Sequence, residues 1–150
     1  MKKIRTMKAI IYSCVVLFFL SSCNMETSNN GDLDGLWQML TIENLQTGEV
    51  KDGRDVGTGL NWAFQGRLLM MRGSEEFVWR FDHSGETLKL YSPYYSGRFR
   101  EVHDDTPVTD ATPLNVYGVY RLEEYFKILQ LDSDNMRLES PNVRLTFRKY

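Results

Sequence analysis

Short stretches of alternating apolar and polar residues dominate the second half of this chain. In residues 76–82, Phe77, Trp79 and Phe81 fall on one face of an extended chain, and the residues between them fall on the other. Residues 143–148 repeat the pattern. A period of two is the signature of a β-strand with one buried face, whereas an amphipathic helix repeats every 3.6 residues. The alternation therefore predicts an antiparallel all-β domain.

About eight strands are expected, separated by turn signals such as His83-Ser84-Gly85 and Pro141-Asn142. Residues 61–71 are expected to form one continuous strand with Trp62, Phe64, Leu68 and Met70 on a single face. The expected strands are 36–43, 48–56, 61–71, 76–82, 87–91, 125–131, 136–138 and 143–148. Residues 114–120 fit a helical turn or a strand. Short strands joined by tight turns favour a barrel or a sandwich.

The N-terminus carries the features of an export signal. Four basic residues precede an apolar run, residues 9–20, that is too short for a comfortable membrane span. The run ends in Leu20-Ser21-Ser22-Cys23, which resembles the lipobox of bacterial lipoproteins. That resemblance implies cleavage before Cys23, lipidation of its thiol and attachment to a membrane through the lipid. Asn24 follows the cysteine, which by resemblance to Gram-negative sorting rules favours the outer membrane.

Three segments are expected: a signal peptide over 1–22, a lipidated cysteine with a polar tether over 23–32, and a globular domain over 33–150. Removal of residues 1–22 takes away four basic residues and no acidic residue, which leaves 14 basic and 20 acidic residues and a net charge of −6. A nucleic-acid partner, which requires a basic surface, is therefore not expected. The globular segment is long enough for one core of its own.

Gly35-Leu36-Trp37 follows shortly after the tether and lies on the first expected strand. This Gly-x-Trp resembles the lipocalin signature, in which the tryptophan closes one end of an eight-stranded up-and-down β-barrel. With the lipoprotein signal, the domain length and the strand pattern, the chain resembles the small lipocalin-like lipoproteins of Gram-negative gut bacteria. The resemblance implies that Arg144 or Arg148, on the last strand, packs over Trp37.

Catalytic and metal-binding patterns are sparse. The sequence has no Gly-x-Ser-x-Gly, and its two cysteines lie in or next to the signal. His103, Asp104 and Asp105 are adjacent, which is a poor arrangement for binding one ion, and no fourth ligand is evident. We therefore expect no enzyme activity, no metal and no cofactor.

Two groups of residues are candidates for ligand binding. The first would point into the barrel, and the second belongs to a long segment, residues 92–113, that a minimal barrel does not require. The candidates are Trp62, Phe64, Trp79 and Phe81 in the barrel, and Tyr94, Tyr95 and Arg98 in the long segment. Tyrosine and arginine are favoured at binding surfaces. The alternatives are that the barrel aromatics are plain core and that the long segment is a solvated insert.

Two functions follow from these candidates. One is a carrier or receptor that holds a small apolar or amphipathic molecule at the barrel mouth. The other is an accessory lipoprotein with a filled barrel, which docks on an envelope protein. A ligand-sized cavity lined by the four barrel aromatics would favour the carrier. A filled barrel with an apolar patch outside would favour the docking module.

Overall fold

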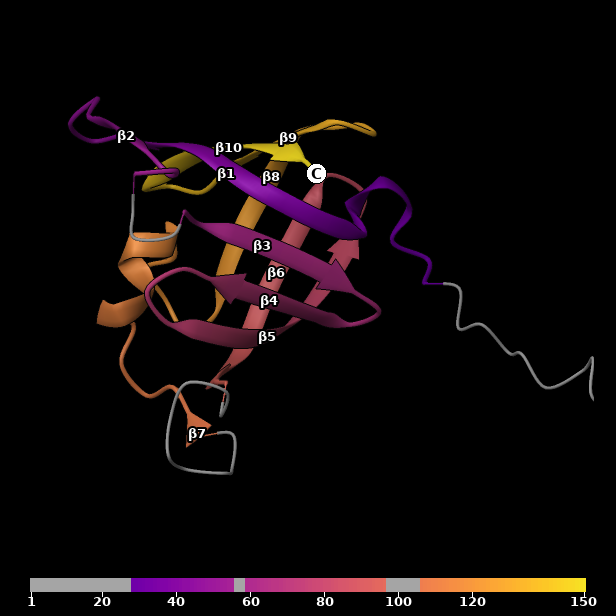
Figure 1. Ribbon diagram of the computed structural model, residues 1–150, viewed down its shortest axis with the longest axis horizontal. Helices are drawn as coiled ribbons and strands as arrows, with labels where there is room; N and C mark the ends of the chain where they lie inside the picture. Colours follow the sequence, from indigo (N-terminus) through magenta and orange to yellow (C-terminus); the bar gives the residue numbers. More distant parts are fainter. Residues whose placement is uncertain (1–27, 56–58, 97–105) are drawn as a thin grey trace, which may run out of the picture.

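The computed structural model describes residues 28–55, 59–96 and 106–150, and its strands wrap into one antiparallel barrel (Figure 1). Eight strands form the barrel, and the pairing of the last strand with the first closes it. In order around the barrel they are β1 (Gly35–Asn44), β3 (Asn61–Gln65), β4 (Leu68–Arg72), β5 (Glu76–Ser84), β6 (Thr87–Tyr95), β8 (Glu124–Leu131), β9 (Asn135–Glu139) and β10 (Val143–Lys149). The up-and-down barrel expected from the sequence is confirmed.

Two further strands lie outside this ring. β2 (Val50–Asp52) pairs with the second half of β1, beyond the point where β3 pairs with its first half. β7 (Thr106–Pro107) pairs with the end of β6. The strand expected over 48–56 therefore corresponds to the short strand β2, which is not one of the eight strands of the barrel.

The strand expected over residues 61–71 is in fact a hairpin. Gly66 turns the chain with a φ of 61°, so that Trp62 pairs with Met71 and Phe64 pairs with Leu69. Because the turn reverses the chain, the buried face moves from even-numbered residues on β3 to odd-numbered residues on β4. The prediction that Leu68 and Met70 share the apolar face of Trp62 was wrong. Leu68 is 47% exposed.

One end of the barrel is closed by the segment that precedes β1. A short 3-10 helix, η1 (Gly31–Leu33), places Leu33 in the core, and the indole Nε1 of Trp37 donates to the Leu33 carbonyl oxygen over 2.8 Å. Lys149 Nζ lies 4.8 Å from the centre of the Trp37 ring. The cation over this tryptophan is thus a lysine. The expected arginines have other partners: Arg148 donates to Gln38, and Arg144 to Glu43 and Glu139.

The other end of the barrel is covered by the 3-10 helix η3 (Thr112–Tyr117). It overlaps residues 114–120, for which the sequence fits either a helical turn or a strand. Leu114 and Tyr117 are fully buried, and the Tyr117 ring meets Phe77 edge-on at 5.4 Å. The Tyr117 hydroxyl donates to the Glu75 carbonyl oxygen over 2.6 Å, and burial raises the pKa of this phenol above its ordinary value. The chain that leaves η3 is fastened by Glu124, whose buried carboxylate accepts the Tyr120 N–H.

The turn between β8 and β9 is built around Asp132. Its carboxylate accepts hydrogen bonds from the Gln130 side chain and from the backbone N–H groups of Asp134 and Asn135. These bonds lower the pKa of Asp132 to about 2, with the Gln130 bond contributing most. A side-chain carboxylate that captures backbone donors two and three residues ahead is a common way to fix a tight turn.

Candidate functional site

The four barrel aromatics expected to line a ligand cavity are buried, and three of them, Trp62, Phe64 and Phe81, pack against other rings. Trp62, Phe64, Trp79 and Phe81 are between 0 and 3% exposed. The ring centres of Trp62 and Phe147 lie 5.0 Å apart. The ring centres of Phe64 and Phe81 lie 5.1 Å apart, and these two rings are perpendicular. Such contacts are typical of a close-packed protein core. At these side chains the interior of the barrel is filled.

Two polar atoms inside this core have no hydrogen-bond partner. The indole Nε1 atoms of Trp62 and Trp79 are buried, and no acceptor reaches them within the described residues. An unpaired buried N–H group costs about 1–3 kcal/mol, and native structures contain few of them. An acceptor atom brought next to either indole would therefore be bound favourably.

The candidates from the long segment separate from one another. Strand β6 continues past a bulge at Ser92, which has a φ of 50°, and so includes Tyr94 and Tyr95. The Tyr95 ring packs on Phe77 at 5.1 Å, at the end of the barrel that η3 covers. Tyr94 faces the outside, opposite Val78. The predicted binding role of the two tyrosines stays a prediction.

Two other residues singled out from the sequence, Arg98 and Cys23, lie outside the described residues. The same is true of the adjacent residues His103, Asp104 and Asp105. Within the described parts of the chain, no three acidic, histidine or cysteine side chains lie close enough to hold a metal ion.

The structure contains a shallow groove of about 490 Å³ on the outer wall of the barrel. Strand β8 is staggered between its neighbours: it pairs with β6 through residues 124–127 and with β9 through residues 127–131. The groove lies around Lys127, where the two pairings meet. The lining residues come from three parts of the chain: Glu86, Thr87, Tyr125, Phe126, Lys127, Glu139, Ser140 and Pro141. The buried ring of Phe126 belongs to the core beneath the groove.

One wall of the groove is the ring of Tyr125, which neighbouring polar groups hold in place. The Tyr125 hydroxyl donates to Glu123 over 2.7 Å, and Lys89 forms an ion pair with the same carboxylate at 3.2 Å. These two partners lower the pKa of Glu123, Tyr125 contributing most. Lys89 Nζ also lies 5.4 Å from the centre of the Tyr125 ring. The ring is 49% exposed and yet has a fixed orientation.

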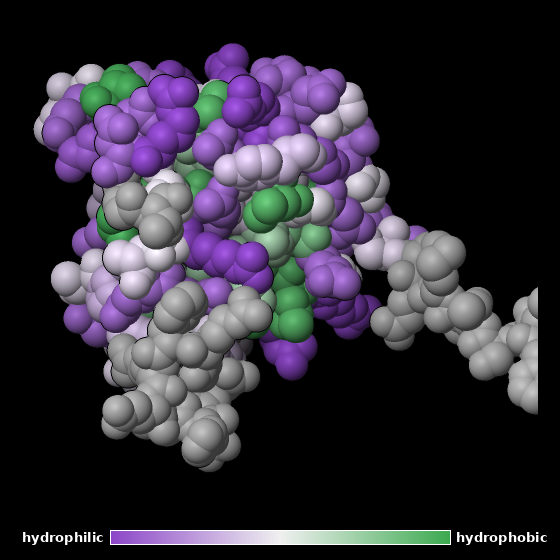
Figure 2. All heavy atoms as spheres, viewed as in Figure 1, coloured by the Kyte–Doolittle hydropathy of each residue, from purple (hydrophilic) through white to green (hydrophobic). Residues whose placement is uncertain are grey.

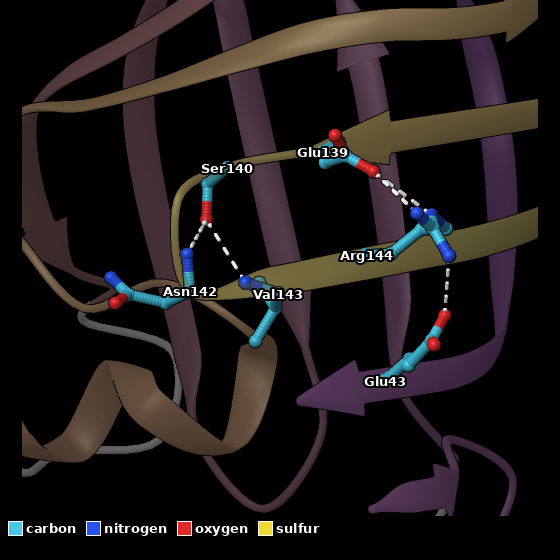
Figure 3. Close-up of polar contacts among 6 residues, drawn as sticks. All are labelled: Glu43, Glu139, Ser140, Asn142, Val143 and Arg144. Atoms are coloured by element: carbon cyan, nitrogen blue, oxygen red, sulfur yellow. Dashed lines mark hydrogen bonds and ion pairs between the residues drawn. The ribbon is translucent and has the colours of Figure 1, made fainter. Parts of the chain in front are cut away.

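The opposite wall is the turn between β9 and β10 (Figure 3). Arg144 donates to Glu139 through Nε at 2.9 Å and Nη2 at 2.8 Å, and its Nη1 reaches Glu43 of β1 at 2.8 Å. These carboxylates, Glu139 first, raise the pKa of Arg144 above its ordinary value. The hydroxyl of Ser140 accepts the N–H groups of Asn142 and Val143. Both walls are thus held by hydrogen bonds and ion pairs within the protein.

The groove offers an aromatic surface, a cation and carboxylates. Lys127 and Glu86 are exposed, whereas Glu139 is already neutralised by Arg144. A flat apolar group could lie on Tyr125 while a carboxylate or a carbonyl oxygen reaches Lys127. These groups are the kinds of contact that a bound partner uses.

No local sequence motif marks this groove. Its residues are separated by up to 55 positions and meet only because β8 pairs with β6 along one half and with β9 along the other. Strand alternation could have assigned Tyr125 and Lys127 to the outer face, since they alternate with the buried residues Glu124, Phe126 and Ile128. The stagger itself could not be predicted from the alternation.

Comparison with known proteins supports the fold. Residues 17–150 match the lipocalin-like domain family. A lipocalin-like protein from Bacteroides uniformis is similar in structure, with a TM-score of 0.58 and 19% identity over 80% of this chain and 100% of that one. An uncharacterized protein from Bacteroides eggerthii has a TM-score of 0.53 and 18% identity over 78% of this chain and 98% of that one. A search of curated proteins found no match.

Proposed function

Because the chain belongs to the lipocalin-like domain family, whose members are generally non-enzymatic binding proteins, we propose that it acts by binding on the outer wall of a filled barrel. The observation that carries this proposal is the packing of the interior. Trp62 and Trp79 are 0% exposed, so their rings border no space that a water molecule could enter. The groove beside Tyr125 lies outside the barrel and is already hollow.

The proposed partner is a protein of the cell envelope. The groove is shallow, its walls are ordered and it combines an exposed tyrosine with an exposed lysine, which is the composition of protein interaction sites more than of enclosed small-molecule sites. Lipidation at Cys23 would keep the domain at the outer membrane, where such a partner would be met. Within the described residues, no helix has both the length and the hydrophobicity to cross a bilayer.

The anchor can be tested by metabolic labelling with an alkyne fatty acid. The natural chain should take up the label, and Cys23→Ser should lose it and leave the membrane fraction or remain an unprocessed precursor. Equal labelling of the two chains would overturn the lipoprotein assignment. This result would leave the proposal for the groove untouched, since the groove does not involve residue 23.

The groove can be tested by placing a photo-crosslinking amino acid at Tyr125 in living cells. A discrete protein adduct is expected, and the added substitution Lys127→Glu should abolish it. The matched control places the same amino acid at Arg137, which is exposed on β9 outside the groove. Equal adducts from both positions, or none from Tyr125, would contradict the proposal.

A small-ligand carrier remains the second candidate, because two indole N–H groups in the barrel lack acceptors. A ligand with an acceptor atom would have to displace η3 and reach Trp62 and Trp79 from that end. Native mass spectrometry of the purified protein would reveal such a ligand as added mass. Quenching of tryptophan emission by an added fatty acid would show that it enters the core. A mass equal to that of the protein alone, together with unchanged tryptophan emission, would exclude a small-ligand carrier.

A further inference from the structure

Apolar residues occupy matching positions on the outside of five neighbouring strands. Leu36 pairs with Ala63, and Ala63 pairs with Met70. Met70 pairs with Val78, which pairs with Tyr94. Because directly opposed residues of antiparallel strands point to the same side of a sheet, these five side chains form one row around the barrel.

The row faces outward, since Ala63, Met70 and Val78 each lie between two buried neighbours on their strands. Leu68, two positions before Met70 on β4, widens it. Figure 2 shows hydrophobic side chains, with hydrophilic ones among them, on the front of the barrel, where Figure 1 draws β1, β3 and β4. We call Leu36, Ala63, Leu68, Met70, Val78 and Tyr94 the apolar face. Single exposed apolar residues are normal, but a contiguous set marks an interaction surface.

The N-terminal segment is fastened beside the apolar face. The side-chain amide of Asn30 donates to the Gly66 carbonyl oxygen over 2.7 Å and to Asp34 over 2.8 Å. Gly66 is in the turn that leads into Leu68. Residues 23 to 28 span at most about 18 Å even when fully extended. A lipid on Cys23 would therefore lie within about 18 Å of residue 28, which is two residues before the Asn30 that contacts Gly66.

The border of the apolar face is basic. Arg67, in the turn next to Leu68, and Arg80, which pairs with Leu68, are exposed and form no ion pair within the described residues. At the other border Arg72 is paired with Glu76. Apolar and tyrosine side chains bordered by free arginines match the bilayer interface, where acyl chains lie beneath phosphate groups.

We propose that the apolar face lies against the phospholipid bilayer to which Cys23 is anchored, with Arg67 and Arg80 at the phosphates. This inference rests on the lipid anchor proposed above. It fixes the orientation of the barrel, which would lie on its side. In the ring of eight strands β9 is opposite β4, so the groove over β6, β8 and β9 would face away from the membrane. A partner could then reach Tyr125 and Lys127.

The test uses the full chain, processed and lipidated in cells, purified and reconstituted into vesicles of phosphatidylethanolamine with a minor fraction of phosphatidylglycerol. Its two cysteines are Cys14, in the expected signal peptide, and Cys23, so one added cysteine can be labelled with bimane. Leu68→Cys reports on the apolar face, and Arg137→Cys on β9 is the matched control. At position 68 we expect blue-shifted emission and a severalfold loss of quenching by aqueous iodide, and at position 137 full quenching.

Each other outcome has a distinct meaning. If the protein fails to float with the vesicles, the anchor is wrong, and that result is read before any bimane signal. Flotation with equal quenching at both positions would overturn the membrane-facing orientation. Protection of position 68 in native envelopes but not in pure vesicles would assign the face to a protein. Protection in detergent together with a dimeric mass would assign it to a second copy. The added substitution Met70→Glu should restore quenching at position 68 while flotation is retained.

Discussion

Replacing Trp37 by alanine tests how the closed end of the barrel is held together. The side chain is fully buried, its Nε1 donates to the Leu33 carbonyl oxygen at 2.8 Å, and Lys149 Nζ lies 4.8 Å from the ring centre. Lys149 Nζ also donates to the Asp32 carbonyl oxygen at 2.7 Å. One tryptophan thus joins β1, β10 and the segment that enters the barrel, and its loss affects all three.

The expected loss of unfolding free energy is about 4–5 kcal/mol for Trp37→Ala. Truncation of a buried tryptophan to alanine costs about 3–5 kcal/mol through lost burial and the cavity that remains. The hydrogen bond adds about 1 kcal/mol, since the Leu33 carbonyl loses its donor. The contact with Lys149 adds about 0.5–1 kcal/mol at this half-buried position. The sum approaches the whole stability of a small domain, and these terms overlap in part.

The measurement is urea unfolding of the chain from residue 23 onward with Cys23→Ser. Trp37→Phe keeps a ring and removes the donor, and should cost about 1–2 kcal/mol. Tyr150→Ala is the matched control, since this aromatic side chain is 71% exposed and its truncation should change stability by less than about 0.5 kcal/mol. A loss below about 2 kcal/mol for Trp37→Ala would refute the reasoning.

Three further changes test other parts of the fold. Gly118→Ala should cost about 2–4 kcal/mol in urea unfolding, because Gly118 has a φ of +77° and a Cβ there would lie 2.5 Å from Leu145 Cδ2. Asp132→Asn should make the free energy of unfolding fall less steeply with decreasing pH. The pKa of Asp132 is about 2 in the fold against 3.8 ordinarily. Its contribution to stability is therefore complete above about pH 5 and is lost as the pH falls through about 2. Urea midpoints across this range check it, and an unchanged acid limb would contradict it. Tyr95→Ala should cost about 1–2 kcal/mol in the same unfolding assay, since the ring packs on the core, whereas Tyr94→Ala should stay within about 0.5 kcal/mol; equal losses would show that both rings serve the core.

Strand alternation predicted most of the barrel because each strand has one face in a single core. Phe77, Trp79 and Phe81 are buried as expected, and the expected strands over 125–131 and 143–148 correspond to β8 and β10. The failure over residues 61–71 has a physical cause. Period two continues across Gly66 in the sequence, but a two-residue turn reverses the chain and exchanges the inner and outer positions. The glycine inside an apolar run was the available signal for that turn.

The candidate site was predicted less well, for a related reason. Whether inward-pointing aromatic side chains leave a cavity depends on how their rings fit together, and alternation says only that they point inward. Trp62, Phe64 and Phe81 pack on one another and on their neighbours, which was the alternative to a ligand cavity. The groove depends on the stagger of β8 between β6 and β9, a long-range property of strand pairing. Local sequence patterns contain no information about it.

The free energy of reorganisation favours the outer wall over the interior. A ligand inside the barrel would have to displace packed rings, and the contacts of one such ring are worth about 3–5 kcal/mol. Unless the ligand replaced those contacts, this would weaken Kd by more than about a hundredfold. In the groove, Arg144 already holds Glu139, and Lys89 and Glu123 already hold Tyr125. Because contacts within the protein already hold these side chains, a partner there would lose little affinity to their immobilisation.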